Sequence, residues 1–404
     1  DLRMSRGLGD VYKRQLLKVT YRRRKYMVVD LQESRKQIDE IDRQIVELFE
    51  KRMDVAANVA DYKIATGKAV FDKEREEQKI DTLRHLAHSD FNNKCVAELF
   101  TQIMAMSRKF QYSKLEMRKS DSRLEPYDIV DDIRRDNIKV VYQGVPGAYS
   151  HEAMLNFFGN DVRNMNVDTF REAMEAVSDG VADYAVIPID NSSAGMVNDT
   201  YDLLQEFNNY IVGETYVKIR HCLLAKPGAT LKDIKCVYSH PQGLAQCAAF
   251  LDRHKDWHQK AYLNTAMSAK KVAEDNDIHQ AAIGSANCAD EYGLQILEDG
   301  INSSACNTTR FVIVSRKREF IKNADKVSVC FEVPHKSGSL YNALSHIMFN
   351  NLNMTKIESR PIPEHNWEFR FFVDFEGNLA DPGVRNALRG ISEESNYLRL
   401  LGNY

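Results

Sequence analysis

The sequence has little that would tie the chain to a membrane, to nucleic acid or to an oxidising compartment. It contains no long run of apolar residues that predicts a membrane-spanning helix, and its basic N-terminal stretch lacks the hydrophobic segment of a secretory signal. A net charge of -3 gives no overall attraction to nucleic acid or to an anionic membrane surface. The seven cysteines include no CxxC pair, which argues against a disulfide framework and a zinc site and fits a reducing cytoplasm. Small-molecule chemistry is therefore the default expectation.

Cofactor-binding motifs are missing as well. A dinucleotide-binding domain needs GxGxxG and a later acidic residue for the ribose, and no such pattern is found. The stretch VVYQGVPGAYSHEA holds Gly144 and Gly147, but no Lys followed by Ser or Thr comes after them, so it fails as a phosphate-binding P-loop and remains a weak anion cradle. We therefore expect neither a metal nor an organic cofactor.

The length of 404 residues, of which 43% are hydrophobic, predicts about two to four domains. The first residues, DLRMSRGLGDVYKRQ, resemble translated adapter sequence, so residues 1–26 are expected to be an artefactual extension or a short disordered arm, with Met27 a plausible start. An all-helical domain is expected over 32–113 and a charged linker over 114–136. Two further domains are expected, over 137–318 and 326–404.

The helical domain is predicted to hold a long helix that ends near Thr66, a second helix over 72–86 and a third over 93–111. Apolar residues at a spacing of three and four predict that the first helix turns one face toward a core. These residues are Ile38, Ile41, Ile45, Leu48, Val55, Val59 and Tyr62. Arg52 occupies a position in this stripe where the pattern asks for an apolar side chain.

A small dianionic ligand would explain Arg52. Arg52 and Lys63 are separated by roughly 16 Å along a helix, which two long side chains can span around such a ligand. Arg35 lies roughly 25 Å from Arg52, so it can reach the same ligand only from an antiparallel partner chain. The alternative is that Arg52 extends from the edge of a helical bundle into solvent and that Arg35 lies on the surface. The polar residues Asp72, Arg75, Glu76 and Gln111 favour a pocket lined by three helices.

The rest of the chain predicts two domains that contain β-sheet. Short β-rich runs alternate with helical patterns from Ile138 onward, which predicts an α/β domain with a mainly parallel sheet. Polar stretches at 188–195, 237–247, 264–266 and 307–311 follow strands, where loops of an open α/β sheet converge on a ligand. The order strand, helix, strand, strand, helix, strand after residue 326 predicts a ferredoxin-like α+β sheet.

The helical motifs SRKQIDEIDRQIVELFEKR, DYK, FDKEREEQKI and SRKFQ resemble the all-helical chorismate mutase family. The resemblance implies that Arg35 of a partner chain and Arg52 hold the two carboxylates of chorismate, while Lys63 and Gln111 hydrogen-bond its ether oxygen. Asp72, Glu76 and Ser107 would complete the pocket, with support from Arg75. A pericyclic rearrangement needs no nucleophile, only a compact substrate conformer and donors at the breaking C–O bond.

The four polar stretches of the α/β domain, taken together, resemble the prephenate dehydratase family, whose domain has two lobes with the substrate between them. The domain order is similar to that of the bifunctional chorismate mutase/prephenate dehydratases. The resemblance implies that Thr309 assists departure of the ring hydroxyl while CO2 is lost. It also implies a group of substrate-binding residues: Asn191, Ser192, Ser239, Gln246, Thr265, Arg310 and Phe311. Two positions depart from the family pattern, since Asp190 replaces Glu and Asn264 replaces Ser.

The stretches KSGSLYNAL and IESRP resemble the effector-binding stretches of the ACT domain that accompanies this dehydratase. The resemblance implies feedback inhibition by phenylalanine at the interface of two such domains. The effector-binding residues would be Gly338, Ser339, Leu340, Glu358, Ser359, Arg360 and Pro361, with Ser339 in place of the usual Ala. The alternative is a sheet that serves only for dimerisation.

The sequence thus predicts a cytoplasmic bifunctional enzyme that converts chorismate to prephenate and then to phenylpyruvate, as a homodimer or dimer of dimers. Two rival hypotheses are a sensor that has lost catalysis, which the intact Thr309 opposes, and a mutase fused to a prephenate dehydrogenase, which the missing dinucleotide motif opposes.

Overall fold

The computed structural model describes residues 30–68, 70–116, 127–275, 277–304, 306–363, 365 and 367–404, and the chain divides into two compact units near Lys119. The extension over 1–26 and much of the linker expected over 114–136 lie outside the described residues. Within the described part, no helix is long and apolar enough to cross a membrane.

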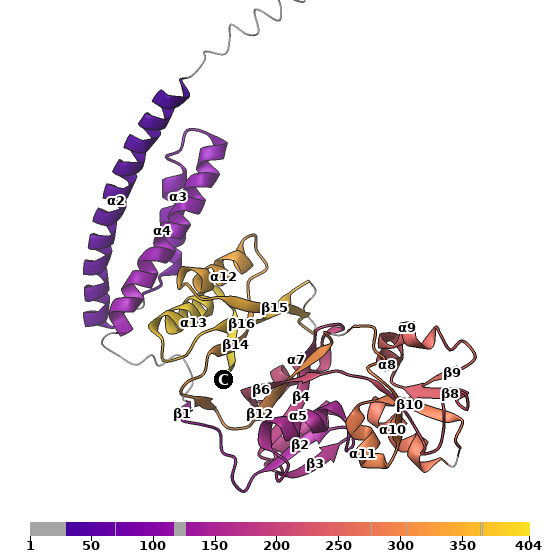
Figure 1. Cartoon of the computed structure of the whole chain (residues 1–404). Helices are drawn as coiled ribbons and strands as arrows, with labels where there is room; N and C mark the ends of the chain where they lie inside the picture. Colours follow the sequence, from indigo (N-terminus) through magenta and orange to yellow (C-terminus); the bar gives the residue numbers. More distant parts are fainter. Residues whose placement is uncertain are drawn as a thin grey trace, which may run out of the picture. The chain divides into compact units, whose positions relative to one another are not determined.

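The first unit consists of three helices: α2 (Leu31–Thr66), α3 (Lys73–Arg84) and α4 (Asp90–Glu116). Asp30 caps α2 by accepting hydrogen bonds from two backbone N–H groups, and Gly67, with φ of 71°, ends it in the left-handed conformation that glycine adopts without strain. Asp72 caps α3 in the same way, by accepting from the backbone N–H of Arg75. Both α2 and α3 pack against α4 (Figure 1).

The apolar stripe of α2 is the first feature that differs from expectation. Ile38, Ile41 and Ile45 are each more than half exposed, and Leu48, Val55 and Tyr62 are exposed to a similar extent. The face that α2 buries within its own chain contains small residues instead, Ala56 and Ala60. The prediction that the stripe faces a core is therefore wrong for the single chain.

The second unit holds two large sheets and the small C-terminal domain. Its first lobe contains β2 (Lys139–Gln143), β3 (Arg163–Val167), β4 (Tyr184–Asn191), β5 (Gly195–Met196), β6 (Tyr210–Lys218) and β12 (Thr308–Ser315), with α5 (Tyr149–Phe158), α6 (Phe170–Ser178) and α7 (Asn198–Glu206). Its second lobe contains β7 (Cys222–Ala225), β8 (Cys236–Ser239), β9 (His258–Ala261), β10 (Gln280–Gly284) and β11 (Gln295–Asp299), with α8 (Pro241–Gln246), α9 (Ala248–Leu251), α10 (Thr265–Glu274) and α11 (Ala286–Tyr292).

These sheets are mixed, which corrects the expectation of a mainly parallel sheet. In the first lobe β2 runs parallel to β3 and β4, while β12 is antiparallel to both β4 and β6. The second lobe has the strand order β11-β7-β10-β8-β9, in which β7 is antiparallel to both of its neighbours. The chain crosses between the lobes twice, from β6 to β7 and from β11 back to β12.

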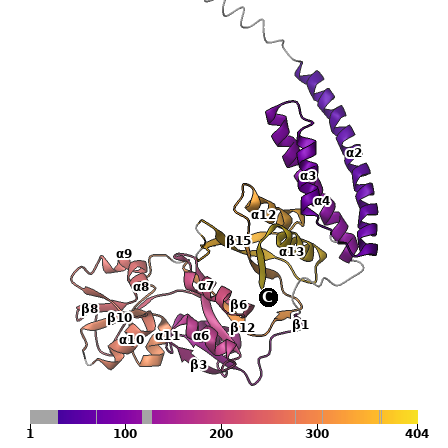
Figure 2. The same cartoon turned by 180° about the vertical axis from the view of Figure 1, so that it is seen from behind.

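The C-terminal domain has the predicted βαββαβ order. Its elements are β14 (Lys326–Glu332), α12 (Ser339–Phe349), β15 (Met354–Pro361), β16 (Phe369–Glu376), α13 (Pro382–Glu394) and β17 (Tyr397–Asn403). Its sheet has the order β15-β16-β14-β17, and β17 pairs with β6, so it extends the sheet of the first lobe. In both views this domain and the second lobe lie at opposite ends of the unit (Figure 1, Figure 2).

Part of the expected linker belongs to this second unit. Residues 128–130 form β1 (Asp128–Val130), which pairs in parallel with β13 (Glu319–Ile321). Ile133, a few residues later, is buried in the core of the first lobe. The linker prediction is therefore wrong for residues 128–133.

Candidate functional site

The three helices of the first unit enclose a cavity of about 630 Å³. Every residue that was predicted for the mutase pocket lines this cavity, except Arg35. These lining residues are Arg52, Lys63, Asp72, Arg75, Glu76, Ser107 and Gln111. Its remaining walls are largely apolar, and they include Val55, Val59 and Met104. The cavity thus combines cations with an apolar surface, as expected for a small anion that carries a hydrocarbon ring.

Arg52 is held at the wall of the cavity by α4. It is partly buried, and its guanidinium donates a hydrogen bond to the Ser107 hydroxyl, which in turn donates to the Ile103 carbonyl at 3.0 Å. Burial lowers the pKa of Arg52, while the nearby Glu76 carboxylate opposes that shift. A partly desolvated guanidinium binds a carboxylate more strongly than one in open solvent.

Lys63 and Glu76 are held at the cavity by contacts of their own. Lys63 Nζ lines the cavity and donates to the Val70 carbonyl at 2.6 Å, which fixes the position of the ammonium group. Glu76 forms an ion pair with Arg108, which is buried and lies 4.6 Å from the centre of the Phe71 ring. Arg108 lies within the motif SRKFQ but was not predicted as a site residue, because only its contact with Glu76 in the fold shows its role.

Gln111 offers the cavity a buried amide. Its side chain is 7% exposed, and its Oε1 has no hydrogen-bond partner among the described residues. A buried polar atom without a partner costs free energy of about 1–3 kcal/mol, so a ligand that bonds this amide recovers part of that cost. Rotation of the amide by about half a turn presents its N–H donors at the same place.

Arg35 lies apart from these residues. It is exposed near the start of α2 and does not line the cavity. A single chain therefore does not bring Arg35 and Arg52 together. This agrees with the prediction from their separation along one helix.

In the second unit, Thr309 and Asn191 face each other across antiparallel strands β12 and β4. The Asn191 Oδ1 accepts hydrogen bonds from the backbone N–H groups of Ser193 and Ala194, both at 2.9 Å. Backbone N–H groups can only donate, so these contacts fix which end of the Asn191 amide is the oxygen. The Asn191 Nδ2 must then donate, and it does so to Thr309 Oγ1 and to Asn307 Oδ1, both at 2.8 Å.

This arrangement determines what the Thr309 hydroxyl can do. Because its oxygen accepts from Asn191, its own hydrogen stays free to be donated elsewhere. Thr309 is only 8% exposed, so the donor is largely shielded from water. The pair is therefore built to present a proton donor rather than a nucleophile.

The other residues predicted for the dehydratase site are engaged with the protein. Ser192 Oγ, in the first lobe, donates to the Cys306 carbonyl at 3.0 Å. Ser239 Oγ, on β8 of the second lobe, is fully buried and donates to the Ile283 carbonyl at 3.0 Å. Thr265 is the first residue of α10, which Asn264 caps by accepting from a backbone N–H at 2.7 Å. Asn264 thus performs at this position the capping role for which Asn and Ser are both suited.

His221 is a further polar residue at the junction of the lobes, and the sequence analysis did not identify it. It lies in the first crossover, 2% exposed, where its Nε2 is 2.9 Å from Gln246 Oε1 and its Nδ1 is 3.1 Å from the Tyr149 hydroxyl. It therefore joins α5 of the first lobe to α8 of the second. Its backbone N–H also donates to Asn302 of the second crossover at 3.2 Å.

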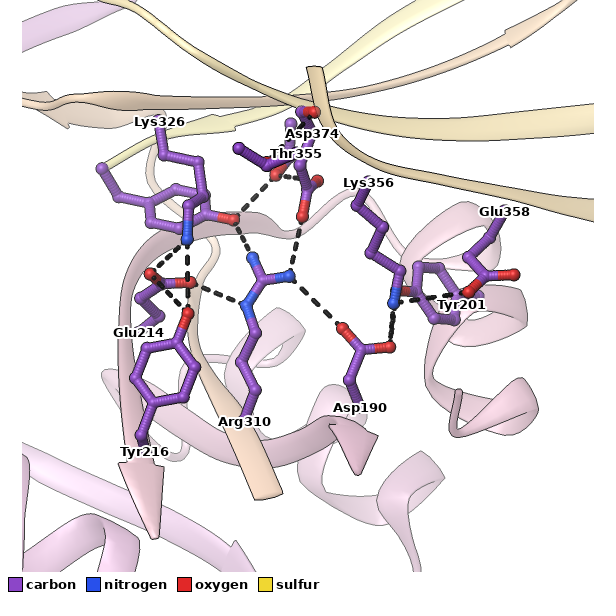
Figure 3. Close-up of polar contacts among 12 residues, drawn as sticks. Asp190, Tyr201, Glu214, Tyr216, Arg310, Lys326, Thr355, Lys356, Glu358 and Asp374 are labelled. Atoms are coloured by element: carbon purple, nitrogen blue, oxygen red, sulfur yellow. Dashed lines mark hydrogen bonds and ion pairs between the residues drawn. The ribbon is translucent and has the colours of Figure 1, made fainter. Parts of the chain in front are cut away.

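Arg310 corrects a site prediction. It was expected to hold a substrate carboxylate beside Thr309, but adjacent residues of a strand point to opposite faces. Its guanidinium bonds Glu214 and Asp374, both at 2.7 Å, and Asp190 at 3.3 Å (Figure 3). Arg310 is therefore committed to three carboxylates on the face opposite to Thr309, and Asp190 shares that face.

Phe311, two residues beyond Thr309, is 2% exposed and packs in the apolar core of the first lobe. It supports the strand beneath Thr309.

The C-terminal domain contains a cavity of about 320 Å³, lined partly by the first predicted effector stretch. Ser339 and Leu340 contribute to it together with Lys336, Trp367 and Phe371. Gly338 opens α12 with φ of 83°, a left-handed conformation that favours glycine.

The second predicted effector stretch, 358–361, does not line this cavity. It lies on β15, the terminal strand of its sheet. There Arg360 forms a bidentate ion pair with Asp202 of α7, with N–O distances of 3.0 and 2.5 Å. A single chain therefore does not join the two effector stretches into one pocket.

Comparisons with known proteins agree with this division of the chain. Residues 34–112 match the family described as chorismate mutase type II, and residues 140–319 match the family described as prephenate dehydratase. The bifunctional chorismate mutase/prephenate dehydratase of Buchnera aphidicola is 32% identical over 382 residues, which cover 93% of this chain and 96% of that protein. Arogenate dehydratase 3 of Arabidopsis thaliana is 40% identical over 288 residues, which cover 66% of this chain and 67% of that protein.

Among solved structures, prephenate dehydratase from Arthrobacter aurescens in complex with L-Phe is similar, with a TM-score of 0.62 and 31% identity. The match covers 66% of this chain and 90% of that one.

Proposed function

The chain belongs to the bifunctional chorismate mutase/prephenate dehydratase family, and from this membership we propose which of its residues perform each reaction and how they are regulated. It is both an isomerase, which rearranges chorismate to prephenate, and a carbon–oxygen lyase, which converts prephenate to phenylpyruvate in phenylalanine biosynthesis. The observation that carries the assignment of residues is that the two units hold different sets of chemical groups. The helical cavity gathers cations, and the β4–β12 pair presents one shielded proton donor.

In the mutase reaction, we assign Arg52 to one carboxylate of chorismate and Lys63 to the ether oxygen. Negative charge grows on that oxygen as the C–O bond breaks, so a fixed ammonium group stabilises the transition state more than the ground state. Gln111 adds its buried amide at the same oxygen, and Glu76, held by Arg108, borders the pocket. No covalent intermediate is needed, because catalysis consists of holding a compact conformer beside these donors.

The second carboxylate requires Arg35 from another subunit. The exposed stripe of α2 is longer and more apolar than a solvated helix face needs to be, which supports pairing with a second α2. In an antiparallel pair whose two-fold axis passes midway between positions 35 and 52, the partner subunit's Arg35 lies beside this chain's Arg52. We therefore propose that the mutase site is shared between two subunits of a homodimer or a dimer of dimers.

In the dehydratase reaction, Thr309 donates its proton to the ring hydroxyl of prephenate. The C–O bond then breaks with release of water, the bond to the carboxylate breaks with release of CO2, and its electron pair completes the aromatic ring. Thr309 regains a proton from solvent. Aromatisation drives the reaction, so one well-placed donor contributes most of the chemical assistance that the site must supply. We retain Asn191, Ser192, Ser239, Gln246 and Thr265 as residues around the substrate, with His221 orienting Gln246.

Arogenate is the second candidate substrate, because an arogenate dehydratase is 40% identical to this chain. Arogenate carries an ammonium group where prephenate carries a keto group, and a carboxylate is the protein group that binds an ammonium group most strongly. The residues proposed around Thr309 include no carboxylate, and Asp190 points away from them. This favours prephenate. Supplying each compound separately to the purified protein tests the assignment, and a kcat/KM higher for arogenate would overturn it.

For regulation, we propose that the C-terminal unit is an ACT domain that binds phenylalanine where two copies meet. Among the described strands, the terminal strand β15 has one unpaired edge, which a second copy can extend. Such pairing would bring the stretch 358–361 of one copy toward the cavity near Ser339 of the other. The start of α12 offers backbone N–H groups to the carboxylate of the amino acid. Inhibition then requires that phenylalanine bind an inactive arrangement more tightly than the active one. Measuring phenylpyruvate formation with and without phenylalanine tests this proposal, and full activity in excess phenylalanine would contradict it.

We also retain the cytoplasm as the proposed location, since all seven cysteines lie in described residues and are free thiols.

A further inference from the structure

Behind the Thr309–Asn191 pair lies a group of charged residues that joins the dehydratase domain to the C-terminal domain, and we call it the junction cluster (Figure 3). Its members from the dehydratase domain are Asp190 on β4, Glu214 on β6 and Arg310 on β12, and its members from the C-terminal domain are Lys326 on β14, Lys356 on β15 and Asp374 on β16. Among these six residues three cations are balanced by three carboxylates, and Lys356 Nζ also lies 3.8 Å from Glu358 Oε1 on its own strand.

The junction cluster is largely removed from water. The Arg310 side chain is 9% exposed, and the side chains of Asp190 and Lys356 are 19% and 18% exposed. Arg310 also donates to the buried Tyr404 hydroxyl at 2.7 Å. Burial by itself would lower the pKa of Arg310, but the surrounding acidic groups raise it. A buried charge network of this kind is a weak source of net stability, because desolvation offsets most of the Coulombic gain.

Its position is more informative than its energy. Asp190 immediately precedes Asn191 on β4, and Arg310 immediately follows Thr309 on β12. Asp190 and Arg310 are paired in register across the two strands, as are Asn191 and Thr309. Two consecutive rungs of one ladder therefore carry the junction cluster on one face and the catalytic pair on the other.

Lys356 is the member that ties this ladder to the C-terminal domain from the side of β4. Its ammonium group bonds Asp190, so the carboxylate of Asp190 is shared between Lys356 and Arg310. A shift of β15 would pull on Asp190 and, through one peptide unit, on Asn191. The 2.8 Å hydrogen bond from Asn191 Nδ2 to Thr309 Oγ1 depends on the register of β4 against β12.

We propose that Lys356, Asp190 and Arg310 are positioning residues of the dehydratase, and that the C-terminal domain, through Lys356, completes that site by holding β4 and β12 in the register that keeps Asn191 against Thr309. This inference rests on the proposed role of Thr309. It differs from a purely adhesive role, in which the cluster would hold two domains together without affecting the geometry of the site.

Lys356→Met tests the proposal, because it removes the charge and keeps most of the side-chain volume. Loss of register by a fraction of an ångström is expected to lower the dehydratase kcat about tenfold to a hundredfold with KM within about twofold, since small misplacements of reacting groups carry costs of this size. The mutase rate of the same chain should not change. Lys356→Arg should restore most of the dehydratase kcat.

Tyr397→Phe is the matched control. It breaks a hydrogen bond that also joins the two domains, in which Gln205 Nε2 of α7 donates to the Tyr397 hydroxyl of β17 at 3.0 Å. We expect a dehydratase kcat within about twofold of wild type, because one neutral hydrogen bond contributes little and this one does not touch β4 or β12. An equal loss of kcat in both variants would show that breaking any contact between the two domains slows the dehydratase. That result would overturn the assignment to Lys356.

Asp190→Asn and the double variant with Lys356→Met complete the test. If the two residues act through one contact, the double variant should be about as slow as the slower single variant, not slower by the product of the two effects. Should Lys356→Met fail to fold, Asp190→Asn decides alone by the same split between kcat and KM. A lowered melting temperature with unchanged kcat would refute the proposal. A wild-type chain inactive on prephenate would instead refute the proposed function.

Discussion

Asn191→Asp is the sharpest perturbation of the dehydratase site, because it replaces one NH2 group by oxygen and leaves the shape of the side chain unchanged. The Asn191 Oδ1 would still accept from the backbone N–H groups of Ser193 and Ala194. Its other end, now an oxygen, would face Thr309 Oγ1 at the distance of 2.8 Å that the amide nitrogen occupies. Thr309 could form a hydrogen bond there only by donating its own hydrogen.

The expected size of the effect follows from this reversal. A hydrogen bond from a hydroxyl to a carboxylate contributes about 1.5–3 kcal/mol. Thr309 must give up that bond before it can donate to the substrate, so the barrier rises by a comparable amount. At about 1.4 kcal/mol per factor of ten, kcat should fall roughly tenfold to 150-fold. Thr309→Val, which removes the donor altogether, should cost about 10²- to 10⁴-fold.

The assay is phenylpyruvate formation from supplied prephenate, with mutase turnover of the same preparation as the internal reference. Thr309→Ser keeps the donor and should retain most activity. Asn191→Asp added to Thr309→Val should cause little further loss, because the hydroxyl it disables is already gone. A kcat for Asn191→Asp within twofold of wild type, or a full further loss in the double variant, would refute the reasoning.

The remaining predictions concern the other sites. Arg52→Ala should abolish mutase turnover and leave dehydration of supplied prephenate intact, and loss of both activities would contradict independent sites. Mixed subunits of Arg35→Ala and Arg52→Ala should recover roughly a quarter of wild-type mutase activity, because half of random dimers then hold one intact site of two; no recovery would contradict a shared site. Substitutions in 358–361 should weaken inhibition by phenylalanine, measured as the concentration that halves dehydratase activity, and unchanged inhibition would place the effector elsewhere. Burial lowers the pKa of His221 below its ordinary value of 6.5, so the neutral ring stabilises the fold above that pH and the contribution is lost as pH falls through the lowered pKa. His221→Gln should therefore show a weaker fall in unfolding free energy than wild type in melts between about pH 8 and pH 5, and parallel profiles would contradict this.

Local patterns in the sequence predicted the elements well. The first helix was expected to end near Thr66, before Gly67, and α2 does end there, while Asp72 marked the start of α3. The βαββαβ order of the C-terminal domain was read correctly, because each strand and helix there has its own periodicity. The polar positions of the helices gave six of the residues that line the cavity, and the family resemblance added Ser107.

Features that depend on long-range pairing were not predictable in this way. The direction of β7 and β12 depends on which strands they join after each crossover, and a local pattern does not contain that information. The apolar stripe of α2 was assigned to a core because periodicity identifies an apolar face without identifying what covers it. His221 and Arg108 were missed because each becomes significant only through contacts with residues distant in the sequence.

Arg310 is different, because the signal against its assignment was present in the sequence. It follows Thr309 in a predicted strand, and strand alternation places the two side chains on opposite faces. The resemblance to a family motif treated them as one group. The structure separates them, and the junction cluster was found on the face that this assignment had overlooked.

The most direct test of the account is a time course in which the purified chain receives chorismate alone. The account predicts that chorismate disappears, that prephenate rises and falls, and that phenylpyruvate accumulates to the amount of chorismate consumed. Consumption of chorismate that stops at prephenate, or no consumption at all, would contradict the claim that this chain carries both reactions.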